Sequence, residues 1–237
     1  MATFQIAYEF EFQNREKVVY PLQLDKDTIS LIPDQKNPLP PWTKLEHCQC
    51  TVCPLIKDRT THCPIAANIA NLIENFKDIK STEHVRITVF TTERAYMKET
   101  TVQRGLSSIF GIIMATSNCP IMNFLKPMAR YHLPFSTDEE TIVRSISMYL
   151  LSQYFIAKRK VQPDLSLLNL DRAYSKVQEV NRGICGRISS VVRQSQIRGD
   201  AANNAIVILD MFSQLLTTEI EQKLDSFATL FEGINLI

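Results

Sequence analysis

The chain has 237 residues, of which 45% are hydrophobic and 22% charged, and its formal net charge is +1. This balance argues against a general nucleic-acid or anionic-membrane binder, and the plentiful apolar residues argue against disorder. The six glycines form no GxGxxG or P-loop pattern, and HExxH and GxSxG are absent, so the common fingerprints of dinucleotide, nucleotide, zincin and serine-hydrolase chemistry are missing.

Residues 1–12 have neither a basic region nor a continuous apolar stretch, so no signal peptide is expected. No window approaches the ~18 apolar residues of a membrane-spanning helix. We therefore expect a cytoplasmic protein with no membrane partner and no specific nucleic acid. In that compartment its six cysteines are expected to be thiols or metal ligands rather than disulfides.

The first 100 residues contain four segments that are typical of strands. Apolar and polar residues alternate over 4–12 and again over 18–24, with a polar turn between them that predicts a hairpin. Residues 85–89 and 95–99 predict a second strand pair. The four prolines of 33–44 indicate an extended linker.

Helices are predicted over 64–79 and 101–115 from the spacing of their apolar residues. Ser136 and Glu139 have the spacing of a capping box, in which each side chain bonds the other residue's backbone N–H. A helix is therefore expected to begin there and to run to about Lys160.

The last third shows two apolar stripes at helical spacing, from Leu170 to Val191 and from Leu209 to Phe231. The sequence thus predicts an α+β fold: a small, mainly antiparallel sheet packed by helices over 1–160, followed by a long antiparallel helical hairpin over 161–237. The hairpin is expected to pack on the first domain. The alternative is that it forms a homodimer or binds a protein partner.

Two features of the first predicted hairpin helix stand out. Gly183 and Gly186 are costly inside a helix, and predict either close packing or a kink. Four arginines lie along the same predicted helix, with acidic residues between them. They are expected to form a solvated face rather than a binding surface. These arginines are Arg182, Arg187, Arg193 and Arg198.

The strongest chemical signal is a set of cysteines. Cys50 and Cys53 form a CxxC knuckle, a spacing that lets two sulfurs face one metal but that also occurs in redox pairs. Three cysteines precede proline, at Cys53, Cys63 and Cys119, whereas composition alone predicts about 0.3 such steps. Proline favours the first helical position, which would place each cysteine at an N-cap, where backbone N–H groups favour a thiolate.

We therefore expect Cys50, Cys53, Cys63 and Cys119 to converge on one metal centre. Structural zinc sites usually have two paired knuckles, whereas here one pair, Cys50 and Cys53, joins the isolated Cys63 and Cys119. This pattern favours an iron–sulfur cluster, with zinc as the alternative. If no metal is bound, the cysteines are small buried residues that cap helices, an interpretation that suits the isolated Cys185.

The sequence leaves open the roles of three further residues near the cysteines. Cys48 either replaces Cys50 as a metal ligand or is an exchangeable thiol. His47 and His62 are either metal ligands or, as we favour, exposed to solvent.

A basic segment follows Cys119 and contains Lys126, Arg130 and His132. These groups would bind an anion or transfer protons if they lay beside the metal. The favoured interpretation is a basic loop whose histidine is hydrogen-bonded to the backbone.

Several motifs resemble an uncharacterised bacterial family of similar length. They are Cys50 to Leu55 (CTVCPL), Cys63-Pro64, Gln103 to Pro120, Lys126 to Phe135 (KPMARYHLPF) and Glu139 to Thr141. The resemblance covers about residues 4–160 well and the C-terminal helices weakly. It implies no activity and no catalytic residues.

Three functions compete at this point, and whether the protein is an enzyme stays open. The first is a cytosolic protein with a four-cysteine metal centre that is structural or senses redox state or metal. The second is a metal-free scaffold or dimerisation module that uses the C-terminal helices. The third is a thiol redox enzyme that uses Cys50 and Cys53.

Overall fold

The computed structural model describes the chain except for residues 1, 34–37, 195–198, 219 and 234–237, and the side chains of 192–194, 212, 215–218 and 220–223 also lie outside the described part. Four strands form one sheet in the order β2-β1-β3-β4. They are β1 (Thr3–Glu11), β2 (Val18–Asp25), β3 (His84–Phe90) and β4 (Ala95–Thr101). Every neighbouring pair is antiparallel, which confirms the predicted hairpin and the predicted second strand pair.

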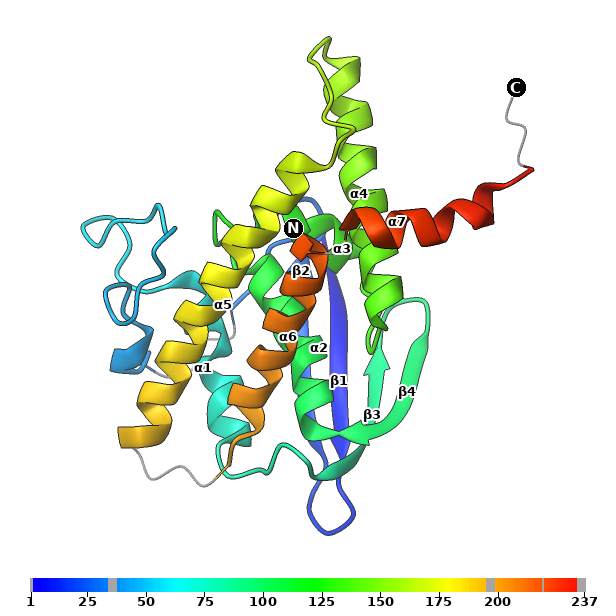
Figure 1. Cartoon of the computed structure of the whole chain (residues 1–237). Helices are drawn as coiled ribbons and strands as arrows, with labels where there is room; N and C mark the ends of the chain where they lie inside the picture. The colour runs from blue at the N-terminus through cyan, green and yellow to red at the C-terminus, as the bar shows by residue number, and fades with distance from the viewer. Residues whose placement is uncertain (1, 34–37, 195–198, 219, 234–237) are drawn as a thin grey trace.

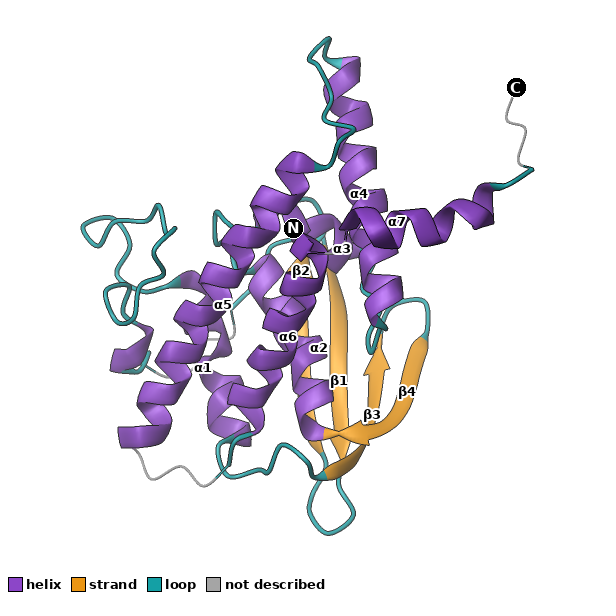
Figure 2. Ribbon diagram, viewed as in Figure 1, coloured by secondary structure: helices purple, strands orange, loops and turns teal. Residues whose placement is uncertain are grey.

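The sheet has one apolar face because its strands alternate. On β1 the residues Phe4, Ile6, Tyr8 and Phe10 are buried, and Gln5 between them is exposed. In the register, Tyr8 stands opposite Tyr20 on β2 and Val89 on β3. Figure 2 shows the strands along one side of the molecule, with α1, α2, α5 and α6 gathered on the other.

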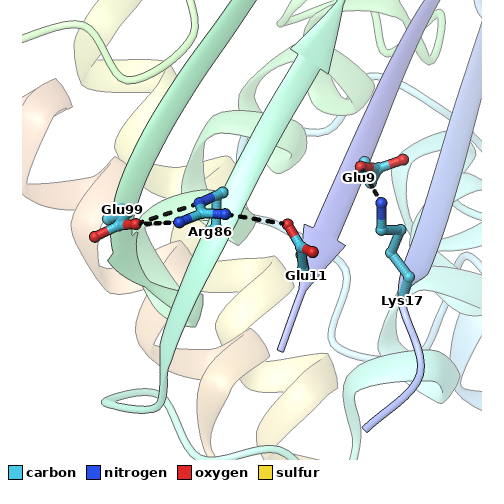
Figure 3. Close-up of polar contacts among 5 residues, drawn as sticks. All are labelled: Glu9, Glu11, Lys17, Arg86 and Glu99. Carbon is cyan, nitrogen blue, oxygen red and sulfur yellow. Dashed lines mark hydrogen bonds and ion pairs between the residues drawn. The ribbon is translucent and has the colours of Figure 1, made fainter. Parts of the chain in front are cut away.

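The opposite face of the sheet carries charge. Arg86 on β3 pairs with Glu99 on β4 and with Glu11 on β1, while Lys17 reaches Glu9 (Figure 3). These side chains are largely in contact with solvent, so water screens each pair and its contribution to stability is small. Their role is to keep this face in water and so to fix which face is buried.

The helices of the first 160 residues are α1 (Pro64–Phe76), α2 (Val102–Thr116), the short α3 (Lys126–Arg130) and α4 (Asp138–Lys158). The helix α2 lies at the centre, because eleven of its fifteen residues are buried. The last turns of α4 project beyond the body of the molecule (Figure 1).

The predicted capping box of α4 is wrong by one residue. Thr137, not Ser136, is the N-cap, and it exchanges bonds with Glu140, not Glu139. The Thr137 hydroxyl accepts from Glu140 N at 3.2 Å, and the Glu140 carboxylate accepts from Thr137 N at 2.7 Å. Ser136 bonds Thr141 instead, so two overlapping S/T-x-x-E patterns competed and the second formed the cap.

The C-terminal third contains α5 (Leu168–Gln194), α6 (Ala201–Thr218) and α7 (Ile220–Ala228). The helix α6 packs against both α5 and α2, and Figure 1 shows it running back beside α5. The second predicted stripe does not form one helix, since α7 turns away from α6 (Figure 1). The side chains of Phe212, Leu216 and Ile220 in that stripe lie outside the described part. The domain boundary at residue 160 stays a prediction. The homodimer or protein partner of the C-terminal helices also stays a prediction.

A single buried apolar cluster extends from the sheet through α2 to α5 and α6. The predicted packing of the C-terminal helices on the rest of the chain is therefore observed. Among the helices described, none combines the length and apolar character that crossing a bilayer would need.

Candidate metal centre

The four predicted cysteines come together between the loop of residues 41–63, the turn at Cys119 and α5. All four line one small cavity of about 20 Å³. Burial raises the pKa of the Cys50 thiol, and the neighbouring Cys53, Cys119 and Cys63 raise it further electrostatically. The structure thus brings together sulfurs that are up to 69 positions apart in the sequence.

The local backbone fixes the position of three of the cysteines. Cys53 N donates to Cys50 O at 3.1 Å, which closes the turn of the knuckle. Cys63 is the N-cap of α1 with Pro64 at its first position, as predicted. Burial raises the pKa of the Cys119 thiol, and the nearby backbone N–H groups of Ile121 and Met122 partly offset this effect. Met122 N itself donates to Cys119 O at 3.0 Å, which closes the turn.

Two of the three Cys-Pro predictions are wrong. No helix follows Cys53-Pro54, where turns at 51–52 and 57–59 flank an irregular stretch. Cys119-Pro120 leads into a turn and a short 3-10 helix (Asn123–Leu125) rather than into an α-helix.

The two glycines of α5 explain how the cysteine loop approaches the helix. A Cβ at Gly183 would lie 3.0 Å from Cys50 Cβ and 3.4 Å from its Cα. At Gly186 the nearest atoms are Cys48 Cβ and Sγ, at 3.7 and 3.8 Å. Glycine at these positions therefore allows the cysteine loop to pack directly on α5. Of the two predicted roles of these glycines, close packing and a helix kink, the structure shows close packing.

The prediction of a solvated arginine face is wrong for Arg187, which lies one turn after Gly183 on α5. It is only 2% exposed. Its guanidinium donates to Trp42 O at 2.9 Å, Lys44 O at 2.6 Å and Leu45 O at 2.8 Å. Arg182 is exposed and pairs with Glu179, whereas the Arg193 side chain and Arg198 lie outside the described residues.

Arg187 also lines the cavity that holds the four thiols. Among the residues that the structure describes, no carboxylate lies within ion-pair distance of it. A buried guanidinium is costly without a counter-charge, since carbonyl oxygens supply dipoles but no net negative charge. Sequence reasoning missed this residue, and only the neighbouring Gly183 and Gly186 hinted at close contact here.

The thiols of Cys50 and Cys119 favour the protonated form in the absence of a cation. Burial, followed by the neighbouring sulfurs, raises the pKa of Cys50 to about 12. Burial also raises the pKa of Cys119. Within the described part of the chain, no three His, Cys, Asp or Glu side chains already stand in metal-ligand geometry.

The remaining candidates have other roles. Cys48 is exposed and touches the same cavity. His47 bonds the Ser190 hydroxyl and His62 the Thr43 hydroxyl, both at 2.7 Å, so each is half-buried rather than plainly exposed. Cys185 does not line the cavity, and burial raises its pKa to about 11.

The basic segment after Cys119 does not line the cysteine cavity. Lys126 donates to Ser30 and Asn118, and Arg130 stacks on Phe4. His132 bonds the Tyr8 hydroxyl, not the backbone as predicted, with 2.5 Å between its Nε2 and the oxygen.

The fold and site together define an α+β protein in which four cysteines converge beside a buried arginine. A sequence model of one family matches residues 6–232 of this chain, and its description is a domain of unknown function, DUF6901. The chain belongs to this family, which confirms the resemblance to an uncharacterised family. Comparisons with curated proteins and with solved structures found no match.

Proposed function

We propose that Cys50, Cys53, Cys63 and Cys119 bind one metal ion through their thiolates, and that the ion has a structural role. The observation that carries the proposal is their shared cavity beside a buried guanidinium that has no carboxylate partner in the described chain. Four thiolates and a divalent ion have a net charge of −2, which supplies the missing negative charge for Arg187.

The electrostatics around the sulfurs support the same proposal. The backbone N–H groups of Ile121 and Met122 lie near Cys119 and lower the pKa of its thiol, against the larger effect of burial. A cation among the four sulfurs would outweigh the mutual repulsion that helps to raise the pKa of Cys50. Binding would draw each sulfur to about 2.3 Å from the ion and release the thiol protons.

The size of the cavity favours a single zinc ion over the iron–sulfur cluster that the cysteine spacing favours. About 20 Å³ is enough for one body the size of a water molecule. An iron–sulfur cluster is larger and would have to push the knuckle away from α5, where Gly183 and Cys50 are already in contact.

A redox pair at Cys50 and Cys53 has less support. Redox cysteines are activated by a lowered thiol pKa, whereas burial holds that of Cys50 near 12. A metal ligand needs no such activation in advance, because the ion itself displaces the proton.

The test is elemental analysis of the full chain, purified anaerobically without added metal. We expect about one zinc per chain, and its loss in Cys119→Ser. Cys185→Ser is the matched control, since Cys185 lies outside the cavity and that variant should keep its zinc. A brown protein that absorbs near ~400 nm would show an iron–sulfur cluster instead, and a protein without metal would overturn the proposal.

A further inference from the structure

A second and larger cavity has no lining residue in common with the cysteine cavity. Its volume is about 190 Å³, and it is a partly open pocket lined by β4 and by helices from α2 to α6. For scale, an engineered apolar cavity of about 150 Å³ accommodates benzene. This one can therefore hold a small molecule with a ring or a short branched chain.

The charges that line this cavity have one sign. Lys98, Arg104 and Arg144 contribute three cations, whereas no aspartate or glutamate is among the lining residues that the structure describes. None of the three cations forms an ion pair within those residues. Arg144 uses one nitrogen, Nη2, to donate to Met128 O and Tyr131 O, so it is fixed in place with its other two nitrogens unused.

The lining changes character along α2. Arg104, Ser107 and Ser108 come from its first turns, and Ile112, Met114 and Ala115 from its last. At 1.5 Å per residue, Arg104 and Ala115 are about 16 Å apart along the helix axis. The cavity therefore has a cationic, hydroxyl-bearing end and an apolar end.

The cationic end also has a fixed neutral hydrogen-bonding group. His132 lines the cavity, and its Nε2 is held by Tyr8, whose hydroxyl is in turn 2.8 Å from Ser108 Oγ. Both partners are set by the sheet and α2, so the imidazole is oriented before any ligand arrives. Such a preorganised polar group at one end of an apolar pocket sets the orientation of a ligand.

We infer that this cavity binds a small carboxylate with an apolar body, its carboxylate facing Arg144 and Arg104 and its ring or chain packed between α2 and α6. Carboxylates are matched by guanidinium groups through charge-assisted hydrogen bonds. A neutral molecule of the same shape would gain the apolar contacts only. The inference is independent of the metal centre, because the two cavities share no lining residue.

The test is titration calorimetry of the full chain with two acids and their amides: benzoate against benzamide, and hexanoate against hexanamide. At least one acid should bind at least about tenfold more tightly than its amide. If neither acid exceeds its amide, or neither binds, the inference is wrong.

Variants locate the site. Arg144→Gln and Arg104→Gln should each weaken binding of the preferred acid about tenfold and leave binding of its amide unchanged. Arg104 is exposed, so its variant remains informative even if the loss of the Arg144 bonds disturbs α3. Gly111→Leu should block both ligands by filling the cavity. The control is Arg182→Gln, an exposed arginine that does not line the cavity; if it weakens binding equally, the site lies elsewhere.

Discussion

Arg187 shows how one residue can couple a loop to a helix. Its guanidinium donates to three carbonyls of residues 42–45, one of which, Lys44 O, also accepts from His47 N. The same group presents a positive charge to the cysteine cavity. A lysine could not replace it, since a single ammonium lacks the planar fork that reaches three acceptors.

His132 is the residue with the clearest dependence on pH. Burial and the charge of Arg144 lower its pKa to about 3 in the folded protein, whereas an unfolded histidine titrates near ~6.5. Between these two values the unfolded chain binds a proton that the folded protein does not. The free energy of unfolding should therefore be highest above pH ~6.5 and fall towards pH 3, by up to about 1.4 kcal/mol per pH unit from this group.

His132→Gln removes that titration. We expect urea unfolding at pH 7 and pH 5 to show a smaller loss of stability on acidification for the variant than for the wild type, by about 1–2 kcal/mol. Parallel pH profiles for the two proteins would show that His132 is protonated without cost in the folded state.

At the level of the elements, α2 contains a matched pair of glycines. A Cβ at Gly105 would lie 2.1 Å from Ile87 Cδ1 and 2.8 Å from Phe10 Cε1, in the tightest part of the core. At Gly111 the nearest atom is Leu209 Cδ2, at an ordinary 3.6 Å. Gly105 is thus required by helix–sheet packing, whereas Gly111 only weakens the helix.

Alanine substitutions should therefore have opposite effects. Gly105→Ala is expected to destabilise the protein by about 1–3 kcal/mol through overpacking. Gly111→Ala is expected to stabilise it by up to about 1 kcal/mol through helix propensity. The free energy of unfolding in urea measures both, and equal values for the two variants would mean that the sheet and α2 can separate without cost.

The elements that local patterns determine were predictable. The period-two alternation predicted β1, β2 and β3, and the spacing of apolar residues predicted α1 and α2, because these signals depend on neighbours in the sequence. The strand β4 was predicted as the partner of β3. Ser136 and Thr137 both fit a capping motif, so the choice between them depended on tertiary contacts. The long second stripe gave no sign of the change of direction at α7.

The candidate site was predictable only in part. The Cys-Pro steps pointed to Cys53, Cys63 and Cys119, and the CxxC spacing pointed to Cys50. The burial of Arg187 and the whole of the larger cavity depend on side chains from distant segments, which no sequence period encodes.

At the scale of the molecule, the cysteines join parts that the sheet does not hold. The core of β1, β3 and α2 is apolar and needs no metal, whereas the loop of residues 41–63 contains turns and few buried side chains. An ion bound by Cys50, Cys53, Cys63 and Cys119 would tie this loop to the turn that follows α2. The expected consequence is a local rather than global dependence on metal, unlike a zinc finger, which unfolds without its ion.

Removal of the metal by a chelator should therefore leave the helix and strand content of the circular dichroism spectrum nearly unchanged but expose the loop to protease. Lys57 and Arg59 are exposed trypsin sites within it. We expect cleavage after these residues, followed by mass spectrometry, to accelerate at least about tenfold on chelation, since a tenfold larger open population costs only about 1.4 kcal/mol of local stability.

Cys119→Ser should be cleaved rapidly with or without chelator, and Cys185→Ser should behave as the wild type. Cleavage at the same rate before and after chelation would show that no ion holds the loop, because a tie between the loop and the core must slow its opening.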